Sequence, residues 1–139
     1  MNNKPLAAHL PATILVFDSG VGGLSIVAEI QRQLPACVIS YCSDNAAFPY
    51  GTKSEKELIG RVDKVLRAAC NLETIDIIVI ACNSASTLAL PYIRNNFEQP
   101  VVGVVPAIKP AAQLSQNKRI GLLATPGTVS RSYTKQLIN

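Results

Sequence analysis

Charged residues are scarce in this sequence and show no block of like sign. They make up only 16% of its 139 residues, whereas 48% are hydrophobic, so the chain is too apolar to be intrinsically disordered. Thirteen lysines and arginines outnumber nine aspartates and glutamates, but the basic residues are dispersed, and acidic residues interrupt them within 53–67. Nucleic-acid-binding proteins usually concentrate basic residues on one face. We therefore expect 53–67 to form a solvated helix face, and we predict no nucleic-acid partner.

Long apolar runs are also missing. The strongest, residues 14–17 and 77–82, are much shorter than the roughly 18 consecutive apolar residues of a transmembrane helix. Near the N-terminus, Lys4 precedes an apolar stretch that His9 and Pro11 interrupt, so no signal-peptide core of the usual length exists. We therefore predict no membrane association and a cytoplasmic location, where the four cysteines stay as thiols.

Metal-ligating residues are equally sparse. The sequence has one histidine, and its four cysteines include no C-x-x-C pair, so no group of residues has the spacing of a metal site. The histidine, His9, lies within residues 1–12, which we expect to be a disordered N-terminal extension. A catalytic Cys–His pair would require this extension to fold back over the chain. We therefore predict neither such a pair nor a bound metal.

From residue 13 onward, apolar segments of two kinds alternate. Continuous runs predict strands, and apolar residues that recur every three or four positions predict helices between them. Ser54 followed by Glu57 has the form of a capping box and predicts a helix start. The predicted strands are residues 13–17, 37–42, 75–81, 100–105 and 119–124, and the predicted helices are 24–34, 54–69, 85–97, 107–116 and 129–138. This alternation predicts an α/β fold, a parallel sheet with flanking helices and right-handed crossovers.

Polar residues follow the predicted strands, at the edge where open parallel sheets bind ligands. Asp18 precedes the glycine-rich residues 20–23, but Ser25 stands where a dinucleotide fingerprint needs glycine, and no G-K-[ST] follows for a P-loop. Two interpretations stay open: the glycines only permit a tight turn into a helix, or their backbone amides bind an anion. Because Asp18 would repel a phosphate, a substrate with both an ammonium and a carboxylate group fits better.

Cys82 ends the most hydrophobic predicted strand and directly precedes a helix. The dipole and free amides of a helix start favour a thiolate, so Cys82 is a candidate base or nucleophile. The alternative is a thiol packed in the core, and the sequence favours neither. We interpret Cys37, Cys42 and Cys70 as core thiols, with Cys42 the one nearest the ligand-binding edge.

Four segments resemble, in order, the successive motifs of the glutamate racemases. They are residues 17–24, 46–51, 81–86 and 123–128, which read F-D-S-G-V-G-G-L, A-A-F-P-Y-G, A-C-N-S-A-S and L-A-T-P-G-T. The resemblance implies a cofactor-independent isomerase that interconverts L- and D-glutamate and supplies D-glutamate for peptidoglycan. It also implies the first α/β domain of a two-domain, pseudo-symmetric racemase at residues 13–98, the start of the second at 99–139, and a homodimer.

The resemblance also implies roles for individual residues. Cys82 matches the first catalytic cysteine, a thiolate base on one face of the substrate α-carbon, and Asp18 lies beside it and assists it. The residues implied to bind substrate are Asp18, Ser19, Pro49, Tyr50, Gly51, Asn83, Ser84, Thr125 and Thr128. Without pyridoxal, the carbanion must be stabilised by hydrogen bonds to its carboxylate, which amides and hydroxyls at helix starts supply.

Racemisation needs a second acid/base group on the opposite face of the α-carbon. In the family this group is a cysteine in a G-C-T-H-like motif from the second half of the chain, and no such motif occurs up to Asn139. The sequence therefore resembles the N-terminal half of a family member. Two alternatives remain: a catalytically inactive α/β fragment that keeps only ligand-binding loops, or a related enzyme, such as an aspartate or hydantoin racemase or a decarboxylase.

Overall fold

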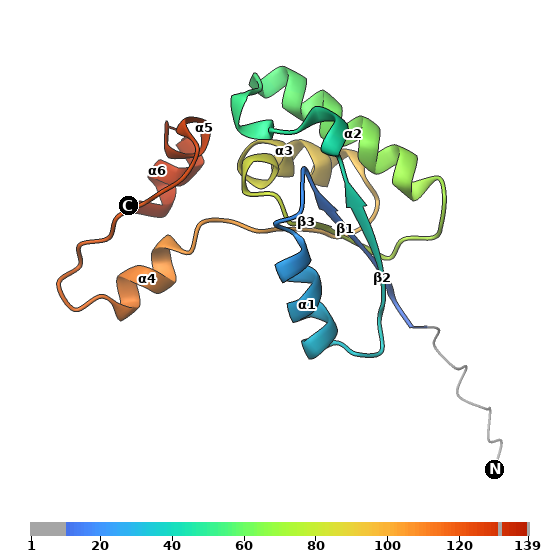
Figure 1. Ribbon diagram of the computed structural model, residues 1–139, viewed down its shortest axis with the longest axis horizontal. Helices are drawn as coiled ribbons and strands as arrows, with labels where there is room; N and C mark the ends of the chain where they lie inside the picture. Colours follow the sequence, from blue (N-terminus) through green and yellow to red (C-terminus); the bar gives the residue numbers. More distant parts are fainter. Residues whose placement is uncertain (1–10, 131, 139) are drawn as a thin grey trace, which may run out of the picture.

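The computed structural model describes residues 11–130 and 132–138 and is built around one parallel sheet (Figure 1). The N-terminal extension predicted for residues 1–12, with His9, lies almost wholly outside the described residues. The strand order is β2-β1-β3-β4, and all three strand pairs are parallel. The strands are β1 (Thr13–Asp18), β2 (Val38–Ser43), β3 (Ile77–Ile80) and β4 (Val101–Gly103). The predicted parallel α/β sheet with flanking helices is therefore confirmed.

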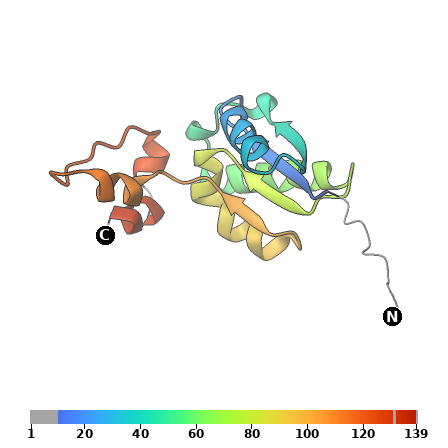
Figure 2. The same cartoon turned by 90° about the horizontal axis from the view of Figure 1, so that it is seen from below.

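Helices cover both faces of this sheet, as the two views show (Figures 1 and 2). On one face, α2 (Glu55–Cys70) and α3 (Asn83–Asn96) bury their apolar stripes against Phe17, Ile78 and other inward residues of the strands. On the other face, α1 (Leu24–Gln33) packs Ile26, Val27 and Ile30 against the strands. Because β1 and β3 are buried on both sides, their sequences are continuous apolar runs rather than alternating ones.

A local signal explains where α2 begins, whereas α3 has no side-chain cap. The Ser54 side chain accepts a hydrogen bond from the Glu57 amide, so the predicted capping box is confirmed. Helix α3 begins at Asn83, two residues earlier than predicted, and it continues through Pro91. This earlier start places Asn83 and Ser84 in the first turn of α3, beside Cys82. The segment after β2, which lies between a predicted strand and a predicted helix, contains two short 3-10 helices, η1 (Asn45–Ala47) and η2 (Tyr50–Thr52).

The fifth predicted strand, residues 119–124, is wrong: in the part of the chain that the structure describes, this segment forms no strand. It lies beyond α4 (Ile108–Leu114), away from the sheet, and Leu123 is fully exposed (Figure 2). A strand needs a neighbour to accept and donate its backbone hydrogen bonds, and none of the four strands reaches this segment.

The last predicted helix, residues 129–138, corresponds to α5 (Pro126–Ser130) and α6 (Ser132–Ile138), and residue 131 between them lies outside the described residues. It starts earlier than predicted because proline suits the first helical position and the Thr125 hydroxyl accepts a hydrogen bond from the Thr128 amide. Across residues 11–130 and 132–138, no helix has the length and apolar character needed to cross a membrane.

Candidate active site

The carboxyl ends of β1 and β3 bring Ser19 and Cys82 together, although 63 residues separate them in the sequence. Phe17 pairs with Ile80 in the sheet, so the residues that follow each strand emerge side by side. The Ser19 Oγ and Cys82 Sγ atoms lie 3.4 Å apart in a buried hydrogen bond in which either atom can donate. The structure thus pairs a hydroxyl and a thiol at the sheet edge where parallel α/β proteins bind ligands.

A cavity of about 390 Å³ opens above this pair. Five of the predicted site residues line it, namely Asp18, Ser19, Cys82, Asn83 and Ser84. Cys82 is 7% exposed and is the residue that precedes the first turn of α3. The amides of that turn lack partners within the helix, so they can donate to a bound carboxylate. The cavity therefore joins a thiol, three serine hydroxyls and a helix start on one surface.

The Asp18 carboxylate points toward the start of α1 rather than into a hydrogen bond with the thiol. Its Oδ2 atom accepts hydrogen bonds from the Gly23 amide, at 3.0 Å, and from the Tyr41 hydroxyl, at 3.4 Å. Tyr41 Oη also lies 2.9 Å from the Gly20 carbonyl oxygen, to which it donates. The Gly23 amide is thus occupied by a side chain of the protein itself and is not free for an anion.

Gly23 lies where the two strands and α1 approach each other closely. A β-carbon there would be 2.9 Å from the Asp18 β-carbon and 3.1 Å from that of Ala81. This supports the simpler of the two interpretations of the glycine-rich turn for Gly23, since packing alone excludes a side chain. Gly20 and Gly22 also line the cavity. Gly22 is exposed there, whereas Gly20 is buried and its carbonyl oxygen accepts hydrogen bonds from the Tyr41 and Ser43 hydroxyls.

Residues Pro49, Tyr50 and Gly51 lie on the far side of Cys82 from α1. The Tyr50 side chain is 2% exposed, packs against Phe17 with ring centroids 6.1 Å apart, and belongs to the same core cluster as Cys82. Its ring therefore packs in the core beneath Cys82 and does not line the cavity. The nearby Phe48 lines the cavity. Burial, and then the hydrogen bond to Asp44, raise the pKa of the Tyr50 phenol far above its usual value.

Thr125 and Thr128 join this group from the C-terminal part of the chain. Their hydroxyl oxygens are 3.1 Å apart, and Thr128 is 2% exposed. A β-carbon on Gly51 would be only 2.7 Å from Thr125 Cγ2, so the two backbones fit only because Gly51 has no side chain. The structure thus brings the Pro49–Tyr50–Gly51 segment and the two threonines together, next to the cavity residues rather than among them.

Two partly buried cysteines, Cys42 in β2 and Cys70 at the end of α2, do not have the character of bases. Burial raises the pKa of the Cys42 thiol, and the Asp44 carboxylate raises it further. Burial also raises the pKa of Cys70. Neither lines the cavity. The prediction that these residues are packed thiols is consistent with this environment.

Sequence reasoning missed Tyr41, Phe48, Asp44 and Arg61. Arg61 was assigned to a solvated face of the 53–67 helix, but its guanidinium makes a bidentate pair with the buried Asp44 carboxylate, at 2.6 and 2.7 Å. That assignment is therefore wrong for Arg61. A sequence offers no signal that pairs residues 17 positions apart on different elements, although Tyr41 and Asp44 could have been flagged because they flank the end of a strand.

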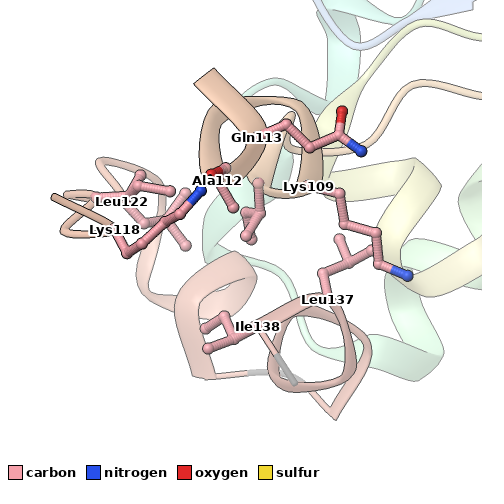
Figure 3. A pocket seen from close by; sticks show the side chains of 9 residues that line it. Lys109, Ala112, Gln113, Lys118, Leu122, Leu137 and Ile138 are labelled. Atoms are coloured by element: carbon pink, nitrogen blue, oxygen red, sulfur yellow. Dashed lines mark hydrogen bonds between the residues drawn. The ribbon is translucent and has the colours of Figure 1, made fainter. Parts of the chain in front are cut away.

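A second cavity, of about 480 Å³, lies apart from this site between α4 and α6 (Figure 3). Its lining is mainly aliphatic, with Leu122, Leu137 and Ile138, and the lysines 109 and 118 lie at its rim. In neither cavity, nor anywhere else among the described residues, do three or more histidines, cysteines, aspartates or glutamates form a group that could hold a metal ion.

The fold and the edge site define a class of α/β protein with a buried cysteine at the carboxyl end of a parallel sheet. Residues 14–139 match the Asp/Glu/Hydantoin racemase family, and the chain belongs to that family. It is 59% identical over 131 residues to a glutamate racemase from Shewanella loihica, covering 94% of this chain and 49% of that protein.

Solved structures of relatives show the same fold. The structure of Escherichia coli glutamate racemase in complex with L-glutamate and the activator UDP-MurNAc-Ala is 55% identical, with a TM-score of 0.87 over 92% of this chain and 48% of that one. Glutamate racemase from Aquifex pyrophilus is 37% identical, with a TM-score of 0.82 over 91% of this chain and 50% of that one. The chain thus spans about half the length of the relatives it matches.

Proposed function

We propose that this chain carries one half of a glutamate racemase site, with Cys82 as the acid/base group for one face of the substrate α-carbon. The observation that supports this most directly is the buried contact between Ser19 Oγ and Cys82 Sγ at the floor of an open cavity. Relatives with more than half of their aligned residues identical are named glutamate racemases, and one is solved with L-glutamate bound. Glutamate is therefore the substrate of the proposal.

In the proposed reaction, the Cys82 thiolate removes the α-proton and becomes a thiol. The electron pair left on the α-carbon delocalises into the substrate carboxylate, whose added negative charge needs hydrogen-bond donors. The first-turn amides of α3 and the hydroxyl of Ser84 lie at the cavity and supply such donors. The Ser19 hydroxyl, already in contact with the sulfur, donates to the thiolate when it forms.

We assign Asp18 a role in shaping this site through the backbone of the α1 start. Its carboxylate accepts from the Gly23 amide and lines the cavity at the same time, so it offers a negative charge to the substrate ammonium group. The Pro49–Gly51 segment, Thr125 and Thr128 form the adjoining wall. Asn83 lies exposed at the cavity, where its amide group can hydrogen-bond the substrate side chain.

The proposal requires a second acid/base group, because a single base returns the proton to the face from which it came. Cys82 is the one cysteine that lines the cavity described here. We propose that the second group belongs to the half of the racemase fold that this chain does not span. In the same proposal, residues 13–98 form the first domain and 99–139 the start of the second.

The proposed role is the supply of D-glutamate for peptidoglycan synthesis, in the cytoplasm, by a homodimeric enzyme. Family membership supports the reaction, and the four free cysteines of the structure suit a reducing compartment. Light scattering after size-exclusion chromatography tests the dimer.

The test is proton NMR of L- and D-glutamate in deuterated water. The 139-residue chain is compared with a chimera in which the C-terminal half of the Shewanella loihica racemase follows it. We expect the chimera to exchange the α-proton and to produce the opposite enantiomer, and Cys82→Ser to abolish both. A folded chimera that leaves glutamate unchanged contradicts the proposal, and faster turnover of aspartate or a hydantoin would assign the chain to another branch of the family. The isolated chain shows whether Cys82 alone exchanges the proton without inversion.

A further inference from the structure

The Asp44 carboxylate is a junction between three elements that surround the site. Its backbone amide donates to the Asp18 carbonyl oxygen at 2.9 Å, which extends the pairing of β1 and β2 by one residue. Its carboxylate accepts a hydrogen bond of 2.6 Å from the Tyr50 hydroxyl and a bidentate pair of hydrogen bonds from the Arg61 guanidinium of α2. One buried acidic residue thus links the end of β1, the η2 turn and the middle of α2.

Charge and burial make this junction rigid. The Asp44 side chain is 3% exposed, and its charge is compensated by Arg61, whose side chain is 34% exposed. The Arg61 hydrogen bonds hold the pKa of Asp44 below its usual value, so the carboxylate stays ionised and continues to accept both donors. A bidentate pair between planar groups fixes direction as well as distance.

The junction connects to the site through Tyr50. With its hydroxyl held by Asp44 and its ring against Phe17, Tyr50 cannot shift without breaking the cluster that contains Cys82. The next residue, Gly51, lies directly against Thr125. A displacement of Tyr50 would therefore move the backbone that contacts the Thr125 side chain.

We propose that Asp44 and Arg61 are positioning residues, which set the wall formed by Pro49, Tyr50, Gly51 and Thr125 relative to Cys82. They touch no reacting atom and act through the Tyr50 hydroxyl. This inference rests on the proposed function for its effect on glutamate, but its structural part can be measured separately.

The test compares Arg61→Gln, Arg61→Lys and Tyr50→Phe in the 139-residue chain, for the structural signals, and in the chimera, for glutamate binding. Arg67→Gln is the matched control, because Arg67 also lies on α2 and pairs with an aspartate, Asp63, on the surface. We follow the NMR signals of the Gly51 amide and the Thr125 methyl group, the dissociation constant for L-glutamate, and the melting temperature.

We expect Arg61→Gln to shift the Gly51 and Thr125 signals and to weaken glutamate binding by about tenfold, since small displacements of site residues strongly reduce their interactions with the substrate. Arg61→Lys, which keeps the charge, recovers part of the loss, and Arg67→Gln changes binding less than about twofold. Because Arg61 and Tyr50 act through the same carboxylate, the double variant Arg61→Gln/Tyr50→Phe loses little more than either single variant.

The inference is overturned if Arg61→Gln lowers only the melting temperature and, while folded, keeps the wild-type signals of Gly51 and Thr125. It is also overturned if Arg61→Lys is no better than Arg61→Gln at a temperature where both are folded. A wild-type chimera that binds no glutamate argues against the proposed function, whereas the Gly51 and Thr125 signals of the 139-residue chain still decide whether Arg61 positions the wall.

Discussion

Gly23 is the position at which the packing of the sheet edge leaves no room for a side chain, and Gly23→Ala tests that packing. Its backbone is helical, with φ −63° and ψ −16°, so alanine meets no conformational barrier. The new β-carbon, however, would lie 2.9 Å from that of Asp18, 3.1 Å from that of Ala81 and 3.2 Å from the Tyr41 ring. Two of these neighbours are β-carbons fixed by strands, so they cannot rotate away.

The expected magnitude is a balance of two effects. Overpacking costs about 1–3 kcal/mol, and the reduced entropy of the unfolded chain returns about 0.4–1 kcal/mol. We expect a net loss near 1–2 kcal/mol, which moves a urea midpoint down by about 0.5–1 M.

Gly60 provides the matched control. It lies in the middle of α2, and a β-carbon there would meet nothing within 4 Å. Gly60→Ala should therefore stabilise the chain by roughly 1 kcal/mol through helix propensity. Circular dichroism during urea denaturation measures both variants. A wild-type midpoint for Gly23→Ala, beside a raised midpoint for Gly60→Ala, would refute the close-packing argument.

Three further predictions concern the polar groups. In the chimera, Cys82→Ser abolishes racemisation in both directions, because an alkoxide is far harder to form than a thiolate; more than a few per cent of residual activity would remove Cys82 from the mechanism. Because the Asp18 carboxylate shapes the site through the Gly23 amide as well as facing the substrate ammonium, Asp18→Asn lowers kcat more than it raises KM, and a change in KM alone would limit Asp18 to holding the ammonium. The folded-state pKa of Asp44 is lowered, so its pairing stabilises the chain above the unfolded pKa near 4, and this stability is lost as the pH falls through the lower folded value. Urea midpoints measured from pH 7 to pH 3 should therefore decline less for Asp44→Asn than for the wild type, and equal declines would contradict that assignment.

The sequence was informative wherever structure is decided locally. The runs at residues 13–17 and 75–81 are apolar because both faces of the central strands are covered, and such runs are recognisable without tertiary information. The edge site was predictable too, since the rule for parallel sheets needs only the strand ends. The sequence thus predicted that Ser19 and Cys82 lie at the same edge of the sheet. It did not predict the hydrogen bond between them.

What could not be predicted depends on partners that are distant in the sequence. Residues 119–124 have the composition of a strand, but none of the four strands pairs with them, so their propensity has no effect. Arg61 has the appearance of any exposed helix residue until the fold places it beside Asp44. The direction of the Asp18 carboxylate, toward Gly23, likewise follows from the approach of α1 and not from its neighbours in the chain.

The strand order determines which strand must wait for its neighbour during synthesis on the ribosome. Strand β1 is translated first among the four, yet it lies between β2 and β3, and its pairing partner Ile77 is synthesised 63 residues after Ile14. At about 5–20 residues per second, the side of β1 that pairs with β3 waits roughly 3–13 s for its neighbour. During that interval the nascent chain exposes an apolar segment, and we expect holding chaperones to bind there.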